Sequence, residues 1–253
     1  MRWNCLEFMK LVNIKWVSLL LISYALALVV LTPLQRLLPL VTPSLAKLGV
    51  TLEETEGSLW RGQSLVRWQP YGYAKVEWDI ELLSLLLLEL PVQISLSNPQ
   101  MAVTGRLTLE PLGLGLANLN GYVDDGLLAP IYTAYNATLS GRLQLDGVTA
   151  TVGWGQKLGD LGGTVTWSGG PVGIPVGREI QSYQVPTLSG QLAASEAGWA
   201  LMVQGERQQD YMQMSLTVAG EGELSVKRAL ADDMGIQVPG NGSSLFDISQ
   251  KVF

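Results

Sequence analysis

The stretch 73-YAKVEWDIEL-82 indicates the fold class of this chain. Every second residue in it is apolar, and the residues between are mostly charged. The apolar set is Ala74, Val76, Trp78, Ile80 and Leu82, and the set between is Tyr73, Lys75, Glu77, Asp79 and Glu81. Successive side chains of a β-strand point to opposite faces of the sheet. The stretch therefore predicts a strand with one apolar face and one polar, solvent-exposed face.

The same alternation continues along the chain with turn residues between the runs. Clear runs occupy 88–96, 101–109, 137–145, 163–167 and 212–218, and a less regular one occupies 199–203. Strands that follow one another directly favour antiparallel pairing. We therefore expect a mainly β protein, in which residues 50–253 form one curled, mostly antiparallel β-sheet domain.

The expectation of a curled sheet comes from glycines on the apolar faces. The pattern apolar-x-Gly-x-apolar is centred on Gly105, Gly141, Gly163 and Gly190. A glycine there removes a side chain from the apolar face and allows a bulge or a sharp bend. The motifs are irregularly spaced, which argues against a solenoid built from true repeats.

The remaining segments predict turns and short helices. Around Asn120-Gly121 and Asp124-Asp125-Gly126 we expect a loop region, and at Asp146-Gly147 a hairpin turn. Short helices are expected at 127–135 and 229–234, and a frayed tail from Pro239 onward.

The N-terminal region predicts a membrane anchor. Residues 16 to 35 contain no charge and are flanked by Lys15 and Arg36, with Trp16 at the start. Such a run is long enough to cross a bilayer as a helix. Basic residues concentrate before it, which favours a cytoplasmic N-terminus. We expect residues 1–15 in the cytoplasm, a transmembrane helix over 16–35, a juxtamembrane connector over 36–49 and the remainder in the periplasm.

A cleaved signal peptide is the alternative for this region, because Ala25-Leu26-Ala27 resembles a cleavage site behind a basic start. The apolar run continues past that site through Leu31, which favours the anchor. The only cysteine, Cys5, precedes the span, so the exported part contains no disulfide.

Charge and composition exclude several classes of function. Residues 36–253 carry 13 basic and 21 acidic side chains, a balance that repels nucleic acid. The chain has no histidine, the usual general base and metal ligand. The acidic clusters Asp124-Asp125, Asp232-Asp233 and 53–56 match no metal-binding pattern, and the glycines of 153–177 match no phosphate-binding loop. We expect no enzyme activity, no metal and no cofactor.

The segment Gly57-Ser58-Leu59-Trp60-Arg61-Gly62 carries a family resemblance. It resembles the Gly-(Thr/Ser)-(Leu/Val)-Trp-x-Gly signature of type II secretion system protein N. Further motifs follow in what resembles the family's order: the Trp78 strand, the Leu-x-Gly-x-Leu strands, Gly163 to Trp167 and Gly198 to Gly205. The loop from Pro171 to Gln184 and the segment near Asn118 do not match. We expect Gly57, Leu59, Trp60 and Gly62 to act structurally, with the glycines making a turn that folds Trp60 onto the sheet.

The resemblance implies an accessory inner-membrane component of the type II protein secretion machinery. Its implied partners are the inner-membrane platform proteins and the secretin. The family is in turn loosely similar to AsmA-like proteins, whose curled sheets form apolar grooves. Two hypotheses therefore stand: a protein that acts through protein contacts in the periplasm, and a lipid-binding or lipid-transfer module with lipid in an apolar groove. Both hypotheses predict the same alternation of apolar and polar residues along the strands, so this alternation does not distinguish them.

Overall fold

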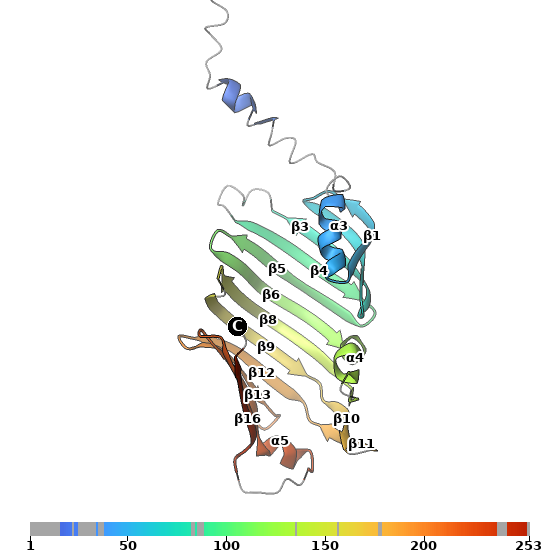
Figure 1. The fold of residues 1–253 in the computed structure, drawn as a ribbon, viewed down its shortest axis with the longest axis vertical. Helices are drawn as coiled ribbons and strands as arrows, with labels where there is room; N and C mark the ends of the chain where they lie inside the picture. Colours follow the sequence, from blue (N-terminus) through green and yellow to red (C-terminus); the bar gives the residue numbers. More distant parts are fainter. Residues whose placement is uncertain are drawn as a thin grey trace, which may run out of the picture.

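The fold is known from a computed structural model, which describes residues 16–21, 23, 24, 34, 38–81, 84, 89–134, 136–155, 157–176, 179–236 and 242–251. From residue 38 onward most of them are in strands of one long sheet (Figure 1). The helices of this part are α3 (Leu38–Lys47), α4 (Asp125–Thr133) and α5 (Arg228–Asp233).

The large sheet has 13 strands in the order β1-β2-β3-β4-β5-β6-β8-β9-β12-β13-β14-β15-β16. They are β1 (Val50–Gly57), β2 (Arg61–Trp68), β3 (Gly72–Ile80), β4 (Leu90–Asn98), β5 (Met101–Glu110), β6 (Gly113–Asp124), β8 (Arg142–Gly153), β9 (Lys157–Trp167), β12 (Leu188–Ser195), β13 (Gly198–Gln204), β14 (Asp210–Thr217), β15 (Glu221–Lys227) and β16 (Ser244–Lys251). Every pairing is antiparallel. The prediction of a mainly β, antiparallel sheet is therefore confirmed.

A second, 3-stranded sheet lies beside the large one. Its order is β11 (Glu179–Val185), β10 (Gly170–Val176) and β7 (Thr138–Leu139). The β10–β11 hairpin contains most of the segment 171–184, which matched no family motif. This segment is therefore a strand pair outside the main sheet and not an irregular loop.

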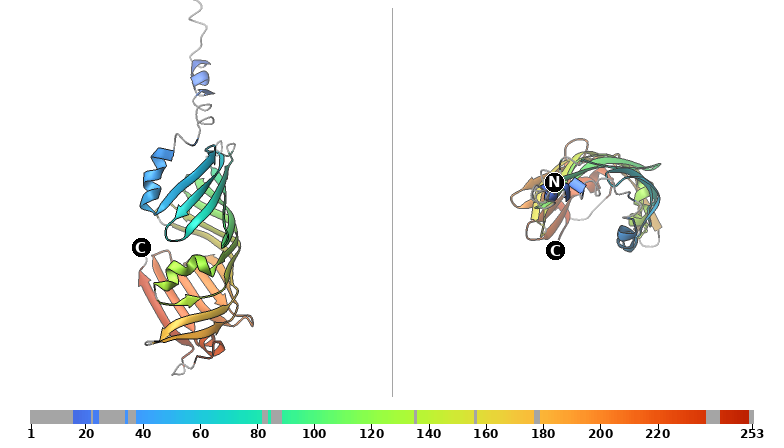
Figure 2. Two further views of the ribbon diagram at one scale, coloured as in Figure 1. Left: turned by 90° about the vertical axis from the view of Figure 1, so that its right-hand side faces the viewer. Right: turned by 90° about the horizontal axis from the view of Figure 1, so that it is seen from above.

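The large sheet is open and bent. Seen along its long axis it forms an arc that does not close on itself (Figure 2). β1 and β16 are its two edges and lie at opposite ends of the strand order. α3 contacts β1, so the chain enters the sheet from the β1 edge (Figure 1).

Two of the four glycines expected to bend the sheet lie at bulges. Gly105 falls where the register between β5 and β6 shifts, and Gly163, with a φ of 105°, falls beside the shift between β8 and β9. Gly190 lies in regular register with Val203, and Gly141 lies just before β8. A bulge increases the local twist and bends a strand, so Gly105 and Gly163 support the predicted curl.

The structure corrects the predicted loop around Asn120-Gly121. These residues belong to β6, a 12-residue strand that pairs with β5 and β8. Asn118, with a φ of 52°, and Gly121, with a φ of 141°, accommodate two register shifts within the strand. Turn-forming residues here make bulges in a paired strand, because neighbours on both sides supply the hydrogen bonds.

Two further predictions, the hairpin turn and the described part of the frayed tail, are wrong because these residues pair in strands. Asp146-Gly147 is not a hairpin turn but lies within β8, where Gly147 has a φ of 58° beside a register shift against β9. The tail predicted to be frayed contains β16, which pairs with β15 along its length. The predicted helices correspond to α4 and α5.

Burial is low throughout this sheet. In the part of the chain that the structure describes, the buried apolar side chains are Val66, Met101, Val148, Tyr211, Val226 and Ala231. One layer of sheet cannot bury both faces of its strands, and two packed layers are the usual solution in folded domains. One face of this sheet is therefore apolar and yet largely uncovered.

The predicted transmembrane helix over 16–35 falls partly outside the described residues, which include 16–21, 23, 24 and 34 of that range. No helix among the described residues is both long enough and apolar enough to span a bilayer. The anchor stays a prediction.

Candidate functional site

One apolar row crosses the large sheet from β3 to β16. The row consists of direct register partners, one from each strand: Val76, Leu96, Val103, Gly121, Leu145, Val165, Gly190, Val203, Met212, Val226 and Phe246. Adjacent strands are about 4.8 Å apart, so the row is about 50 Å long. Because register partners share a face, the apolar side of the sheet is continuous along most of its length.

This apolar face is hollowed at its C-terminal end. A cavity of 610 Å³ is lined by large apolar side chains from β9 and from β12 to β16. Its principal residues are Leu192, Trp199, Leu201, Met214, Leu224 and Ile248. All of them come from strands of one sheet, so the cavity exists because the sheet is concave on this side, in agreement with the arc in Figure 2.

The hollow is open to solvent. Met214 is 41% exposed and Ile248 is 51% exposed. Three residues, Leu201, Met214 and Leu224, are successive register partners across β13, β14 and β15, with Leu192 and Ile248 on either side. Exposed apolar residues scattered singly are ordinary, whereas a contiguous exposed patch marks a binding surface.

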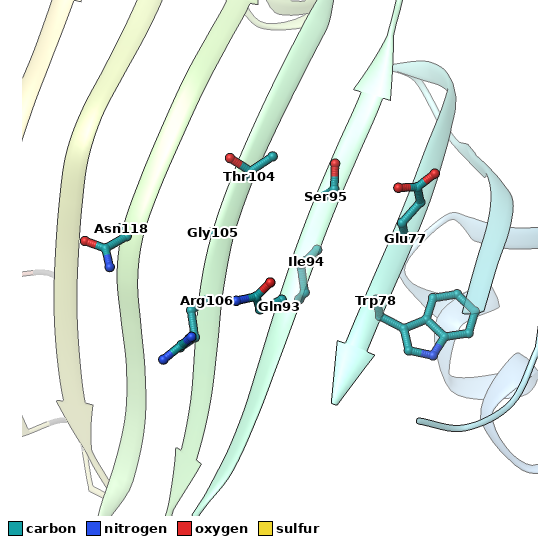
Figure 3. A pocket seen from close by; sticks show the side chains of 9 residues that line it. All are labelled: Glu77, Trp78, Gln93, Ile94, Ser95, Thr104, Gly105, Arg106 and Asn118. Atoms are coloured by element: carbon teal, nitrogen blue, oxygen red, sulfur yellow. The ribbon is translucent and has the colours of Figure 1, made fainter. Parts of the chain in front are cut away.

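The opposite face is polar and carries shallow depressions. One of those at the N-terminal end has a volume of 350 Å³ and is shown in Figure 3. Glu77, Ser95, Thr104, Arg106 and Asn118 reach it from four neighbouring strands, with the Trp78 indole at its border. Arg106 forms a 3.6 Å ion pair with Glu81 and its side chain is 43% exposed. This arrangement places both signs of charge close together on the polar face.

Farther along the sheet, Arg142 makes a second charged cluster. Its Nε donates a 2.6 Å hydrogen bond to Asp124 Oδ1, and its guanidinium lies 4.3 Å from the centre of the Tyr122 ring. The hydrogen bond to Asp124 raises the pKa of Arg142. Asp124 was expected in a solvated loop or at a helix cap; it is the last residue of β6, directly precedes α4 and pairs with a cation.

A third cluster joins α5 to β14. The buried Tyr211 hydroxyl donates to the Asp233 carboxylate, and Gln209 Nε2 donates to the same carboxylate oxygen at 2.7 Å. These hydrogen bonds lower the pKa of Asp233, whereas burial together with Asp233 raises the pKa of Tyr211. This contact could not be predicted from local sequence patterns, because Tyr211 and Asp233 are 22 residues apart.

The motif residues Gly57, Leu59, Trp60 and Gly62 lie together in the turn that joins β1 to β2. Gly57 pairs with Gly62, and Ser58 Oγ accepts hydrogen bonds from the backbone N–H groups of Trp60 and Arg61. Trp60 is half-buried. Trp78 from β3 covers the turn, and its indole N–H donates to the carbonyl oxygens of Ser58 and Leu59 at 3.3 and 3.1 Å.

Of the three residues expected to flank the membrane anchor, the structure describes only Trp16. Trp16 is helical and 66% exposed, while Lys15 and Arg36 lie outside the described residues. Over the part of the chain that the structure describes, no group of three acidic or thiol side chains could hold a metal ion.

Sequence reasoning found part of the hollow and missed the rest. Trp199, Leu201 and Met214 belong to predicted alternating runs, and Leu192 belongs to a glycine motif. Leu224 and Ile248 were not assigned to strands, although Gly222, Leu224 and Val226 alternate with polar residues, as do Phe246 and Ile248. That period-two signal is short, and the glycines nearby suggested loops instead.

Comparison with known proteins identifies the family of this chain but no individual relative. No curated protein and no solved structure matches the chain. The model of the family described as "Type II secretion system (T2SS), protein N" matches residues 48–237. This range begins just before β1 and ends just after α5, so the match covers nearly the whole sheet. The chain therefore belongs to the type II secretion system protein N family and is an accessory component of that machinery.

Proposed function

We propose that this protein acts without catalysis, by binding other type II secretion components through the edges and the polar face of its sheet. The observation that carries this proposal is the open sheet with an edge at each end. An edge strand presents a row of unpaired N–H and C=O groups, to which a partner can add a strand.

The two edges are not equivalent. β1 has a register irregularity between Glu53 and Glu56, with Glu54 at a φ of 44°, and its charged side chains discourage unselective pairing. β16 pairs with β15 in unbroken register from Phe246 to Lys251. A regular edge is the better template for strand addition, so β16 is the favoured docking edge.

The polar face supplies selectivity. Glu77, Arg106 and Asp124 with Arg142 place both signs of charge across it. Mixed charge rejects mismatched partners more than it adds affinity. The inner-membrane platform proteins and the secretin are the partners that family membership suggests.

Photo-crosslinking in secreting cells tests this proposal. A photoreactive residue at Ser249 on the β16 edge, or at Glu77 on the polar face, should capture platform proteins or the secretin. Thr51 on β1 is the matched edge control and should capture less. If variants that still support secretion capture no secretion protein at any of the three positions, action through direct contact is wrong.

We also propose that the sheet lies in the periplasm, held by a single inner-membrane helix over residues 16–35 with the N-terminus in the cytoplasm. The uncharged run and the basic residues before it support this topology. A cysteine at Glu196, in the exposed β12–β13 turn of a Cys5→Ser chain, should react with an impermeant maleimide in intact spheroplasts. Reaction only after lysis would contradict the topology.

A further inference from the structure

Among the described strands, β16 has a neighbour on one side only. It is the last strand of the large sheet, at one end of the arc (Figure 2). From Phe246 to Lys251 it pairs with β15 without a register shift, so its other side presents a regular row of unpaired N–H and C=O groups. Phe246 and Ile248 remain 48% and 51% exposed, because they have a cross-strand neighbour on one side only. Such an edge is a template for a further strand.

The charges along this edge match a second copy of the same strand. When a strand pairs antiparallel with its own copy, the residue at the centre faces itself, and residues equally far on either side face each other. With Ser249 at the centre, Asp247 of each copy faces Lys251 of the other. These residues lie on the polar face, where Asp247 is the register partner of Ser225. Opposite charges directly across two strands stabilise the pairing, and here the pair occurs twice.

Both charged groups are available for this pairing. Asp247 is exposed, and hydrogen bonds from the Ser225 and Ser244 hydroxyls lower its pKa, so it is ionised at neutral pH. A carboxylate has about four acceptor sites, which leaves room for an ammonium group. Lys251 is also exposed. It forms no ion pair with any residue that the structure describes, although Glu221 is its register partner on β15.

Charge favours this register over its neighbours. A pairing centred on Ile248 overlaps an equally long part of the regular strand, 246–250 in place of 247–251, but it sets Asp247 opposite Ser249 and forms no ion pair. A pairing centred on Asp247 brings two like charges together, which is destabilising. With Ser249 at the centre, Ile248 lies diagonally across from Ile248 of the second copy, a distance that a long side chain can span. The apolar contact is therefore retained.

The other edge of the sheet is a poorer partner for β16. β1 has a register shift between Glu53 and Glu56, and α3 packs against it. Pairing of β16 with β1 of another copy would also leave each assembly with a free edge at both ends, so it would continue into a filament, whereas pairing of β16 with itself closes after two copies.

We propose that the β16 edge binds β16 of a second copy of this chain in antiparallel register, with Ser249 at the two-fold axis and an Asp247–Lys251 ion pair on either side. This rests on the proposed role of β16 as a docking edge and names one partner for it. Because the free edge accepts one strand, a second copy and a secretion component compete for β16.

Charge reversal tests both the dimer and its register. The purified full chain in detergent should sediment as a dimer in analytical ultracentrifugation. Asp247→Lys or Lys251→Asp alone should raise the Kd of the dimer about tenfold or more, because like charges then face each other. The two reversals combined in one chain should restore the dimer, and a mixture of the two single variants should form mixed dimers. Asp160→Lys and Lys157→Asp on β9 are matched controls and should leave the Kd unchanged.

Cysteine crosslinking reads the register directly. In a Cys5→Ser chain under mild oxidation, Ser249→Cys should form a disulfide-linked dimer faster than Ile248→Cys, because only residue 249 faces its own counterpart. Equal rates, or faster linkage at 248, would contradict the register. Circular dichroism checks that each variant keeps the β-sheet.

Two other outcomes overturn the proposal. A parent chain that is monomeric at every concentration measured forms no such dimer, and a dimer that survives both single reversals is held by another surface. Neither result affects capture of secretion proteins at Glu77 in cells. Conversely, absence of those captures would leave the dimer of the purified chain intact, so the two proposals can fail separately.

Discussion

Gly62 shows at the scale of single residues why the family motif requires glycine. A Cβ atom built on Gly62 would lie 2.4 Å from Trp78 Cζ2 and 2.6 Å from the Glu56 carbonyl oxygen. Real Cβ atoms do not approach other non-bonded heavy atoms this closely, so either the hairpin or the Trp78 indole would have to move. The motif glycine thus makes room for an aromatic ring from the next strand.

We therefore predict that Gly62→Ala lowers the free energy of unfolding by about 1–3 kcal/mol, the usual cost of overpacking. Gly115→Ala is the matched control, because its nearest neighbour would be 3.7 Å away, an ordinary contact. Its effect should stay within about 0.5 kcal/mol. Denaturant titrations of both variants measure the difference, and equal stabilities would mean that the turn relaxes without cost.

The Tyr211–Asp233 contact predicts a pH dependence of stability. Tyr211 and Gln209 hold the pKa of Asp233 below its ordinary value in the folded protein. Their contribution is therefore fully present above the unfolded pKa, about 3.9, and is lost as pH falls through the lowered folded pKa. Asp233→Asn should have a lower free energy of unfolding than the parent at about pH 6, and this difference should narrow as the pH falls below about 3.9. A difference that is independent of pH would show that ionisation of Asp233 is irrelevant.

At the scale of elements, β6 is where turn-forming residues occur inside a paired strand. Asn118, Asn120 and Gly121 sit between β5 and β8, and the Asn120 side chain accepts a 2.8 Å hydrogen bond from the Gly147 N–H of the bulge in β8. Two bulges that were predicted as a loop and a turn thus stabilise each other across the sheet.

This arrangement predicts slow hydrogen exchange along β6. Amides of 119–123 should be protected as strongly as those of β5, since central strands open only in larger unfolding events. The exposed β12–β13 turn at 196–197 is the internal reference for fast exchange. Hydrogen–deuterium exchange with mass spectrometry measures the exchange rates of 119–123, of β5 and of this turn. If 119–123 exchange as fast as the turn, these residues do not form a paired strand.

At the scale of the whole molecule, the sheet is a single curved layer with few buried side chains. Most of its backbone hydrogen bonds are satisfied within the sheet, while one apolar face remains available. The protein is an elongated, open sheet and not a compact two-layer domain, and this shape suits a component that binds partners along its length.

The elongated shape predicts distances between spin labels on the polar face. Lys75 on β3 and Gln213 on β14 are eight strand steps apart, so labels there should be about 30–40 Å apart, allowing for curvature. Gln144 on β8 and Gln213 are four steps apart and should give about 20 Å. Double electron–electron resonance on cysteine variants of a Cys5→Ser chain measures both. Similar distances for the two pairs would indicate a sheet that closes on itself.

The sequence by itself determined the strand class, the apolar side of most strands and the family, because alternation and short motifs are local. Val76, Leu145 and Met212 were each expected on an apolar face, and the register aligns them in one row. The absence of histidine likewise limited the chemistry before any fold was known.

Only the tertiary structure decided where the bulges lie and which apolar surface stays open. Asp146-Gly147 forms a turn or a bulge according to whether strands pair on both sides of it, which its own sequence does not encode. In the same way, the strands that contain Leu201 and Met214 show the same alternation of apolar and polar residues whether or not a second layer covers these side chains. Coverage depends on contacts between distant residues and on the curvature they impose, so the hollow emerges only when β9 and β12 to β16 are assembled in one sheet.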